Sequence, residues 1–229
     1  SSITENSGGT ITITATLSFA TIIDTTVVLD TSGTGTEGTD YGTISDITIS
    51  AGDTTGTATF TPTDDSVYEG NETAAVTITN VVGADAGSTT SQTITITEND
   101  STPVVTLATS ASTIAENAGS SLTLTATLSG TTDADITVAL DTSGTATEGT
   151  DYTDGSGNID DITISAGDVT GTVSFTPTDD SIYDATSNET ATISINGVSG
   201  KTGVAENSTP QSVTITITDN ESAPSVTLT

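Results

Sequence analysis

Acidic side chains are concentrated in one short stretch, residues 61–73, with the sequence TPTDDSVYEGNET. Four carboxylates, Asp64, Asp65, Glu69 and Glu72, fall within nine residues there, and no basic residue lies among them. Carboxylates this close repel one another unless a cation lies between them. A second stretch over residues 176–190, TPTDDSIYDATSNET, carries the acids Asp179, Asp180, Asp184 and Glu189. The pattern predicts a cation-binding motif that occurs twice.

The rest of the chain repeats together with this motif. The sequence ENSGGT at Glu5 returns as ENAGSS at Glu116, and EGTDY at Glu37 returns unchanged at Glu148. A chain of 229 residues has the length of two ordinary domains. We therefore predict one domain over 1–100, whose first strand is incomplete, a second domain over 103–221, and a terminal segment over 222–229.

Apolar residues recur with a period of two. Ile11, Ile13, Ala15 and Leu17 alternate with Thr and Ser, and the same alternation returns from Leu122 onward. Such a period is typical of strands with one buried face, and no stretch has a sustained helical stripe. About seven short strands for each repeat, separated by Gly, Asp, Asn and Pro turns, favour a sandwich. The predicted fold class is all-β: two tandem seven-stranded antiparallel Greek-key (immunoglobulin-like) β-sandwiches.

The two ends of the chain have matching patterns. Residues 103–108, PVVTLA, form the expected first strand of the second repeat, and only Ser1 and Ser2 precede Ile3 at the same place in the first. Residues 224–229, PSVTLT, repeat that strand pattern. Two interpretations stay open. The chain is a piece cut from a longer tandem array, with 222–229 as the first strand of a third repeat, or 222–229 donates a strand to the next molecule and builds a filament.

The charge balance limits the partners. Thirty-one acidic residues face a single basic one, Lys201, and the formal net charge is −30. Such a chain repels nucleic acid phosphates and anionic membranes, so we expect no nucleic acid partner and no membrane insertion. It contains no Cys or His, which makes zinc, copper and iron sites unexpected. A bland alternative is that the acidic surface only confers solubility or salt tolerance.

Calcium is the cation that these acids suit best. Each repeat adds further acids to its cluster: Glu5 or Glu116, Asp40 or Asp151 in a GTDY loop, and a terminal acidic triplet at 98–100 or 219–221. In a Greek-key sandwich, alternate loops and strand ends meet at one pole, where these groups would form a cage. Calcium accepts about 6–8 oxygen ligands in flexible geometry, whereas magnesium prefers tight octahedra. A carboxylate pair also serves glycosidases, but no aromatic-lined cleft is indicated, so we expect no enzyme. Glu37 and Glu148 are expected to be surface charges.

Four motifs in order resemble the Calx-β domain: ENSGGT at Glu5, GTDY at Gly38, the DDxxYExxE spacing from Asp64, and ITEND at Ile96. The resemblance covers nearly the whole chain, twice. This family is known from sodium–calcium exchangers, integrin β4 and many bacterial surface proteins. The resemblance implies a seven-stranded immunoglobulin-like sandwich that binds a cluster of Ca²⁺ ions at the pole next to the following domain.

Carried over by position, the resemblance implies eight metal ligands in each repeat. In repeat two, Asp184 replaces a Glu and stands two residues further from Glu189, and Asn99 and Asn220 occupy positions where relatives often have Asp. Fewer charges should lower the affinity or the number of ions. The implied ligands are Glu5, Asp40, Asp64, Asp65, Glu69, Glu72, Glu98 and Asp100, and then Glu116, Asp151, Asp179, Asp180, Asp184, Glu189, Asp219 and Glu221.

The expected function is that of an extracellular structural or adhesive repeat module whose junctions are stiffened by Ca²⁺. The expected partners are neighbouring copies or repeats of the same protein, arranged head to tail, and an unidentified cell-surface or matrix ligand. The expected location is the cell surface or the extracellular space, for a secreted protein of bacterial type. Two alternatives are a ligand-binding adhesin domain pair and a Ca²⁺-sensor module.

Overall fold

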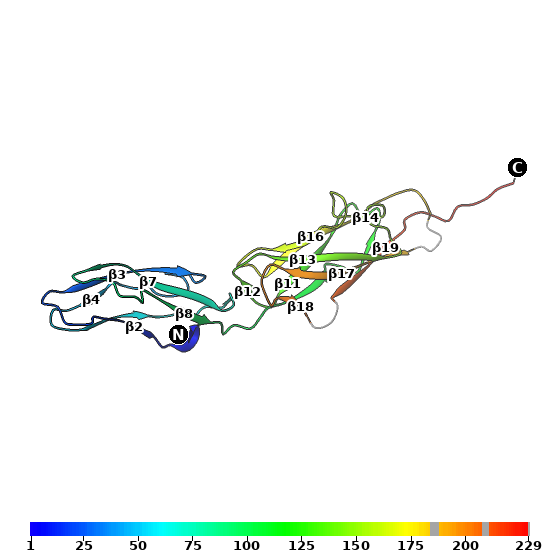
Figure 1. The fold of residues 1–229 in the computed structure, drawn as a ribbon. Helices are drawn as coiled ribbons and strands as arrows, with labels where there is room; N and C mark the ends of the chain where they lie inside the picture. The colour runs from blue at the N-terminus through cyan, green and yellow to red at the C-terminus, as the bar shows by residue number, and fades with distance from the viewer. Residues whose placement is uncertain (184–187, 208–210, 229) are drawn as a thin grey trace. The chain divides into compact units, whose positions relative to one another are not determined.

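The chain divides into two compact units, Ser1–Asp100 and Ser101–Thr229. A computed structural model describes residues 1–183, 188–207 and 211–228 (Figure 1). Within these residues, the regular structure of both units is made of strands, apart from one helical turn, η1 (Glu5–Ser7). None of the described segments forms a helix that is long and apolar enough to span a bilayer.

The first unit contains eight strands, several of them very short. They are β1 (Ser2–Thr4), β2 (Ile11–Thr16), β3 (Thr25–Gly33), β4 (Ile47–Ile49), β5 (Thr55–Phe60), β6 (Val67–Tyr68), β7 (Glu72–Val82) and β8 (Ser91–Thr97). One sheet has the order β1-β8-β7-β3-β4, and β2 pairs with β5 in the opposite layer. The acidic stretch predicted to bind a cation therefore lies between β5 and the start of β7.

The described part of the second unit contains eleven strands. They are β9 (Val104–Thr109), β10 (Thr113–Ala115), β11 (Leu122–Leu128), β12 (Thr131–Thr132), β13 (Ile136–Gly144), β14 (Tyr152–Thr153), β15 (Ile162–Ile164), β16 (Thr170–Pro177), β17 (Asn188–Ser199), β18 (Ala205–Glu206) and β19 (Ser212–Thr218). Its sheets have the orders β10-β19-β17-β13-β15 and β14-β16-β11-β9-β18. The predicted all-β sandwich class is confirmed.

Three strand pairs at sheet edges depart from the antiparallel pattern. β1 pairs with β8, β10 with β19 and β18 with β9, each in parallel. The first two pairs have the same place in the two units, because β1 and β10 both lead into the glutamate of the ENSGGT or ENAGSS motif. Parallel pairing brings each of these glutamates to the end of the strand that carries the terminal acidic triplet.

The cores form as the period of two predicts. In β4, Ile47 and Ile49 are buried and the intervening Thr48 is exposed. β-branched and aromatic side chains suit such half-buried strands. The tyrosine of each GTDY loop also packs inward: Tyr41 stacks on Phe60 with ring centroids 4.8 Å apart. Tyr152 and Phe175 do the same at 4.7 Å. Each aromatic pair therefore anchors an acidic loop to its core.

One glycine allows the close approach of strands that positions the acidic stretch. Gly33 ends β3 with φ of +134°, where a Cβ would lie 2.0 Å from the carbonyl oxygen of Thr73. No other residue type fits so close to a neighbouring backbone without a shift. This contact holds the end of β3 against the start of β7, which carries Glu72.

Candidate metal centre

The GTDY loop places its aspartate by backbone hydrogen bonds. The Thr36 N–H donates to Asp40 Oδ2 at 2.5 Å, and the Thr63 N–H donates to the Asp40 carbonyl oxygen at 2.9 Å. The stacking of Tyr41 fixes the next residue, so Asp40 is buried with 8% exposure. The second unit repeats the first bond, with the Thr147 N–H donating to Asp151 Oδ2 at 2.6 Å. Both loop aspartates are thus held in place while one carboxylate oxygen remains outside this turn.

Glu37 and Glu148 close the same loops and are not simple surface charges, so that prediction was wrong. Glu37 is half-buried, and its carboxylate accepts from Thr31 Oγ1 at 2.6 Å and from the Ile44 N–H at 2.9 Å. Glu148 is half-buried too and accepts from Thr142 Oγ1 at 2.8 Å. Each glutamate therefore ties its loop to the strand β3 or β13.

Thr31→Val is expected to lower the free energy of unfolding of the first unit. The change removes the hydroxyl that donates to the Glu37 carboxylate, and a hydrogen bond to a charged group contributes about 1.5–3 kcal/mol. Urea unfolding monitored by circular dichroism measures the effect. Thr48→Val on the exposed face of β4 is the control and should change stability by about 0.5 kcal/mol at most. Equal losses in the two variants would contradict the role given to Glu37.

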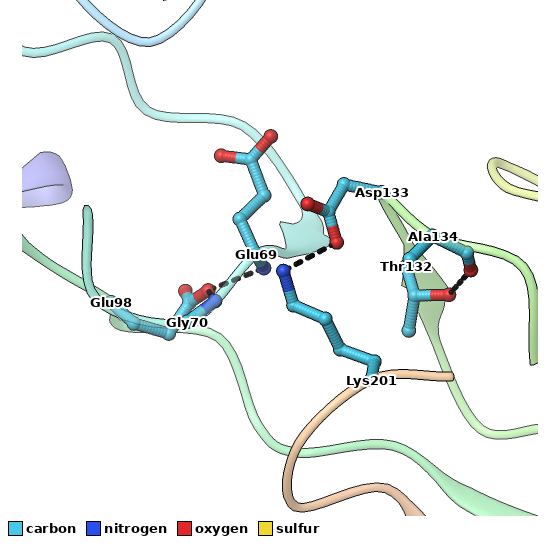
Figure 2. Close-up of polar contacts among 7 residues, drawn as sticks. All are labelled: Glu69, Gly70, Glu98, Thr132, Asp133, Ala134 and Lys201. Atoms are coloured by element: carbon cyan, nitrogen blue, oxygen red, sulfur yellow. Dashed lines mark hydrogen bonds and ion pairs between the residues drawn. The ribbon is translucent and has the colours of Figure 1, made fainter. Parts of the chain in front are cut away.

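In the first unit, Glu5, Glu98 and Asp100 form one carboxylate group. One oxygen from each lies within 4.8 Å of the others. Glu98 is held by four backbone amides: those of Glu69 and Gly70 donate to Oε2 at 2.7 and 2.8 Å (Figure 2). The amides of Asn99 and Asp100 donate to Oε1 at 2.9 and 2.8 Å. The Glu98 carboxylate thus fixes the geometry of the group.

Burial and mutual repulsion perturb this group. Burial raises the pKa of Glu5 to about 7, and its hydrogen bond to Glu98 adds to the rise. Burial acts to raise the pKa of Glu98 as well, but hydrogen bonds from Glu5 and from backbone amides outweigh it and hold that pKa below its ordinary value. Burial, together with the charges of Glu98, Asp65 and Asp64, raises the pKa of Asp100. Of the two glutamates, Glu5 therefore keeps a proton more readily, and Glu98 loses its proton more readily.

A second carboxylate group in the first unit contains Asp40, Glu69 and Glu72, whose oxygens also lie within 4.8 Å of one another. The amide contact between Glu69 and Glu98 links it to the first group. Asp64 and Asp65 are exposed beside the groups. Asp64 Oδ1 accepts from Asn99 Nδ2 at 3.5 Å, and Asp65 Oδ1 accepts from the Val67 N–H at 2.7 Å. The expected single cage is therefore two linked groups with two flanking acids.

The second unit gathers its predicted residues in a similar way. Oxygens of Glu116, Asp179 and Glu221 lie within 4.8 Å of one another. Burial raises the pKa of Glu116 to about 7, with Glu221 and Asp219 adding to the rise. A cavity of about 10 Å³, the space of about one water-sized sphere, has five carboxylates in its lining: Glu116, Asp151, Asp180, Glu189 and Asp219. Asp184, also predicted as a ligand, lies outside the described residues.

Two buried oxygens in these groups have no hydrogen-bond partner in the described structure, Asp100 Oδ2 and Glu221 Oε2. Each belongs to the last acid of its repeat. A buried charged oxygen without a partner is costly, whereas a metal ion would satisfy it. Because all the converging donors are hard oxygens, the residues fit Ca²⁺ better than a transition metal.

No basic side chain neutralises these carboxylate groups in the described structure. Lys201 is the one basic side chain in the sequence. Its Nζ lies 2.6 Å from Asp133 Oδ1, in an ion pair that involves none of the predicted ligands (Figure 2). The groups therefore depend on protonation or on a cation from solution to offset their charge.

Comparison with known proteins decides the family. The sequence profile of the Calx-beta domain matches residues 2–100 and again residues 98–221. The chain belongs to the Calx-beta family. No curated protein sequence is similar enough to count as a relative. The predicted tandem Calx-beta domains are confirmed.

Several solved structures resemble these Calx-beta domains at low sequence identity. CBD12 from CALX1.2 has a TM-score of 0.39 and 14% identity, over 94% of this chain and 95% of that one. The calcium binding domain CBD12 of CALX1.1 has a TM-score of 0.40 and 14% identity, over 95% and 96%. The Yersinia pseudotuberculosis adhesin InvE has a TM-score of 0.41 and 17% identity, over 94% of this chain and 56% of that one. The family rests on the sequence match alone.

Proposed function

We propose that the chain is a Ca²⁺-binding structural module of the cell surface or extracellular space. The observation that carries this proposal is the pair of buried, unpartnered oxygens, Asp100 Oδ2 and Glu221 Oε2, each beside a buried glutamate. Cations are the ligand class that such oxygens attract. The residues that would hold the ion are Glu5, Glu98 and Asp100 in the first unit, and Glu116, Asp179 and Glu221 in the second.

Calcium in these groups would act electrostatically. Without the ion, the carboxylates repel one another, and the backbone beside them is free to bend. A bound Ca²⁺ supplies positive charge that holds them together. Asp100 is the last residue of its compact unit and Ser101 begins the next, so a cation on Asp100 holds the chain at the boundary. The proposed role is mechanical: binding links the stiffness of the junction to the Ca²⁺ concentration.

The proposed location outside the cell is supported by the net charge of the chain and by the Ca²⁺ affinity expected of such modules. A formal charge of −30 favours cations and disfavours nucleic acid and anionic membrane partners. Extracellular modules bind Ca²⁺ at about 10⁻⁴–10⁻³ M, which suits a protein outside the cell. We propose neighbouring copies or repeats of the same protein as partners, and we assign no catalytic role to the carboxylates.

Asp100→Asn and Glu221→Gln are each expected to weaken Ca²⁺ binding by at least about tenfold, because each removes a charged ligand. Isothermal titration calorimetry measures the change. Asp53→Asn, in the exposed turn after β4, removes the same charge outside the groups and should leave binding unchanged. Equal weakening in all three variants would mean that Ca²⁺ affinity depends only on the net charge of the chain, which would contradict the assigned site.

Solution scattering tests the mechanical part. The distribution of intramolecular distances should be narrower when Ca²⁺ is present than when it is removed by a chelator. Asp100→Asn should keep the broad distribution in both conditions. Identical curves with and without Ca²⁺, in a chain that calorimetry shows to bind it, would overturn the mechanical role and leave the binding site intact.

A further inference from the structure

The middle residue of each terminal acidic triplet is neutral: Asn99 in the first unit and Asn220 in the second. Each has an acid on either side of it in the sequence. The Asn99 N–H donates to Glu5 Oε1 at 3.1 Å. In the same way, the Asn220 N–H donates to Glu116 Oε1 at 3.0 Å. Both asparagines therefore lie against the buried glutamate of a carboxylate group.

In the first unit, a backbone contact sets the orientation of the Asn99 side chain. Its Oδ1 accepts from the Asn6 N–H, in the turn η1, at 3.1 Å. The amide nitrogen is then the atom that faces the acidic stretch, and Nδ2 donates to Asp64 Oδ1 at 3.5 Å. An amide NH₂ group is a donor of two hydrogens and offers no acceptor oxygen to a metal ion. The side chain thus links the triplet, the turn η1 and the acidic stretch without adding charge.

The second unit repeats this contact and adds another. Asn220 Nδ2 donates to Asp179 Oδ1 at 3.4 Å, and Asp179 has the place in its repeat that Asp64 has in the first. The same nitrogen donates to Glu221 Oε1 at 3.1 Å. Asp179 and Glu221 are both members of the carboxylate group of this unit. The amide therefore bridges two carboxylates of one group, which is the contact that a cation would make.

A neutral donor in this position changes the metal-free state of the group. Carboxylates that lie together repel one another, and a hydrogen bond to an ionised acceptor is stronger than one between neutral groups. Each asparagine supplies such donors where no basic side chain of the described structure does so. An aspartate in the same position would remove the donors and add a negative charge. The amide therefore lowers the repulsion that the group has without an ion.

We propose that Asn99 and Asn220 are positioning residues that hold the acidic groups together when Ca²⁺ is absent. Each amide nitrogen has the place of a cation beside Asp64 or Asp179. An entering ion competes with the amide for the same carboxylate oxygens. The two asparagines thus reduce the stability that the chain gains from Ca²⁺. This inference rests on the proposed function, because it concerns the metal-free state of the proposed calcium site.

The combined variant Asn99→Ala/Asn220→Ala tests the role of the amides. Both side chains are exposed, so the fold should be retained. In chelator, we expect the Tm of each unit to fall by about 4 °C, because hydrogen bonds to charged groups are lost. In saturating Ca²⁺, the Tm should stay close to that of the natural chain, because the ion then holds the carboxylates. The rise in Tm with Ca²⁺ is therefore larger in the variant, as scanning calorimetry would measure.

The variant Asn99→Asp/Asn220→Asp adds a carboxylate in place of each amide. Its Tm in chelator should fall below that of the alanine variant, because repulsion is added to the loss of the donors. Its Ca²⁺ affinity should rise by at least about tenfold, since Ca²⁺ sites gain affinity with ligand charge. Titration calorimetry measures this change. The control Asn80→Asp/Asn196→Asp adds the same charge at exposed positions of β7 and β17 and should change neither quantity.

Two results for the alanine variant would overturn the proposal. An equal fall in Tm with and without Ca²⁺ would show that the asparagines have an ordinary structural role in both states. A smaller rise with Ca²⁺ than in the natural chain would show that their side chains are metal ligands. An unchanged Tm in chelator would contradict the hydrogen-bonded restraint itself.

The chelator and Ca²⁺ measurements also separate this proposal from the calcium site. A natural chain whose Tm ignores Ca²⁺, with an alanine variant that is less stable in chelator, would contradict the metal site and support the restraint by the amides. A natural chain that responds to Ca²⁺, with an alanine variant that has the same rise, would contradict the role of the amides only.

Discussion

Calcium at about a hundredfold excess over its dissociation constant is expected to raise the Tm of the chain by about 10 °C or more. Such an excess stabilises a folded domain by about 2.7 kcal/mol for each site that binds only the folded state. For a domain of this size, 1 kcal/mol corresponds to about 4–8 °C. The physical cause is the neutralisation of carboxylates that are buried together, including the unpartnered oxygens of Asp100 and Glu221. Differential scanning calorimetry with Ca²⁺ and with a chelator measures the shift.

A pair of matched variants shows whether the shift belongs to the carboxylate groups. Asp100→Asn/Glu221→Gln removes one ligand from each unit and should abolish most of the rise. Asp53→Asn/Asp168→Asn removes two charges from exposed turns in the same position of each unit and should retain it. Magnesium should give a smaller rise, because it prefers a tighter octahedral shell. A Tm that does not move with Ca²⁺ would reject the metal hypothesis.

The strands were predictable because their pattern is local. Alternation in β2, β4 and β11 is visible in the sequence, and in each strand the expected face is the less exposed one. The parallel edge pairs were not predictable in this way. β1 and β10 are three residues long and β18 is two, too short for any period to show. Their pairing depends on which strands, far away in sequence, the fold places beside them.

The repeat made it predictable that the acids lie together, but not that individual acids have different roles. The sequence presents Glu98 as one ligand among eight, whereas the structure surrounds it with four backbone amides. Those amides belong partly to residues 69 and 70, which are distant in sequence. A hydrogen bond between a side chain and a distant backbone leaves no local signal. Glu37 looked like a surface charge for another reason: its partners Thr31 and Ile44 are near in sequence, but only the path of the loop brings them to its carboxylate.

The similarity of 224–228 to 103–107 was visible in the sequence, where a strand of a further repeat and a donated strand were the two interpretations. Both interpretations stay predictions.

Without calcium, stability is expected to fall as pH rises from about 5 to about 8. The pKa values of Glu5 and Glu116 are about 7 in the folded chain, against an ordinary value of 4.5. The folded state therefore binds more protons than the unfolded state between these values, and the slope of unfolding free energy with pH is negative. A pKa raised that far corresponds to at most about 3 kcal/mol for each glutamate. Glu98, whose pKa is lowered, acts in the opposite direction, below about pH 4.5.

Saturating calcium should reverse this dependence, because the ion binds the deprotonated carboxylates and competes with protons. Chemical unfolding at a series of pH values, in chelator and in Ca²⁺, measures both slopes. Glu5→Gln/Glu116→Gln should flatten the fall in chelator, since it replaces the two groups that must lose protons in a buried site. A metal-free chain whose stability rises steadily from pH 5 to 8 would show that these glutamates are charged at little cost. The carboxylate groups would then be ordinary solvated surface, and the electrostatic basis of the proposed junction would be lost.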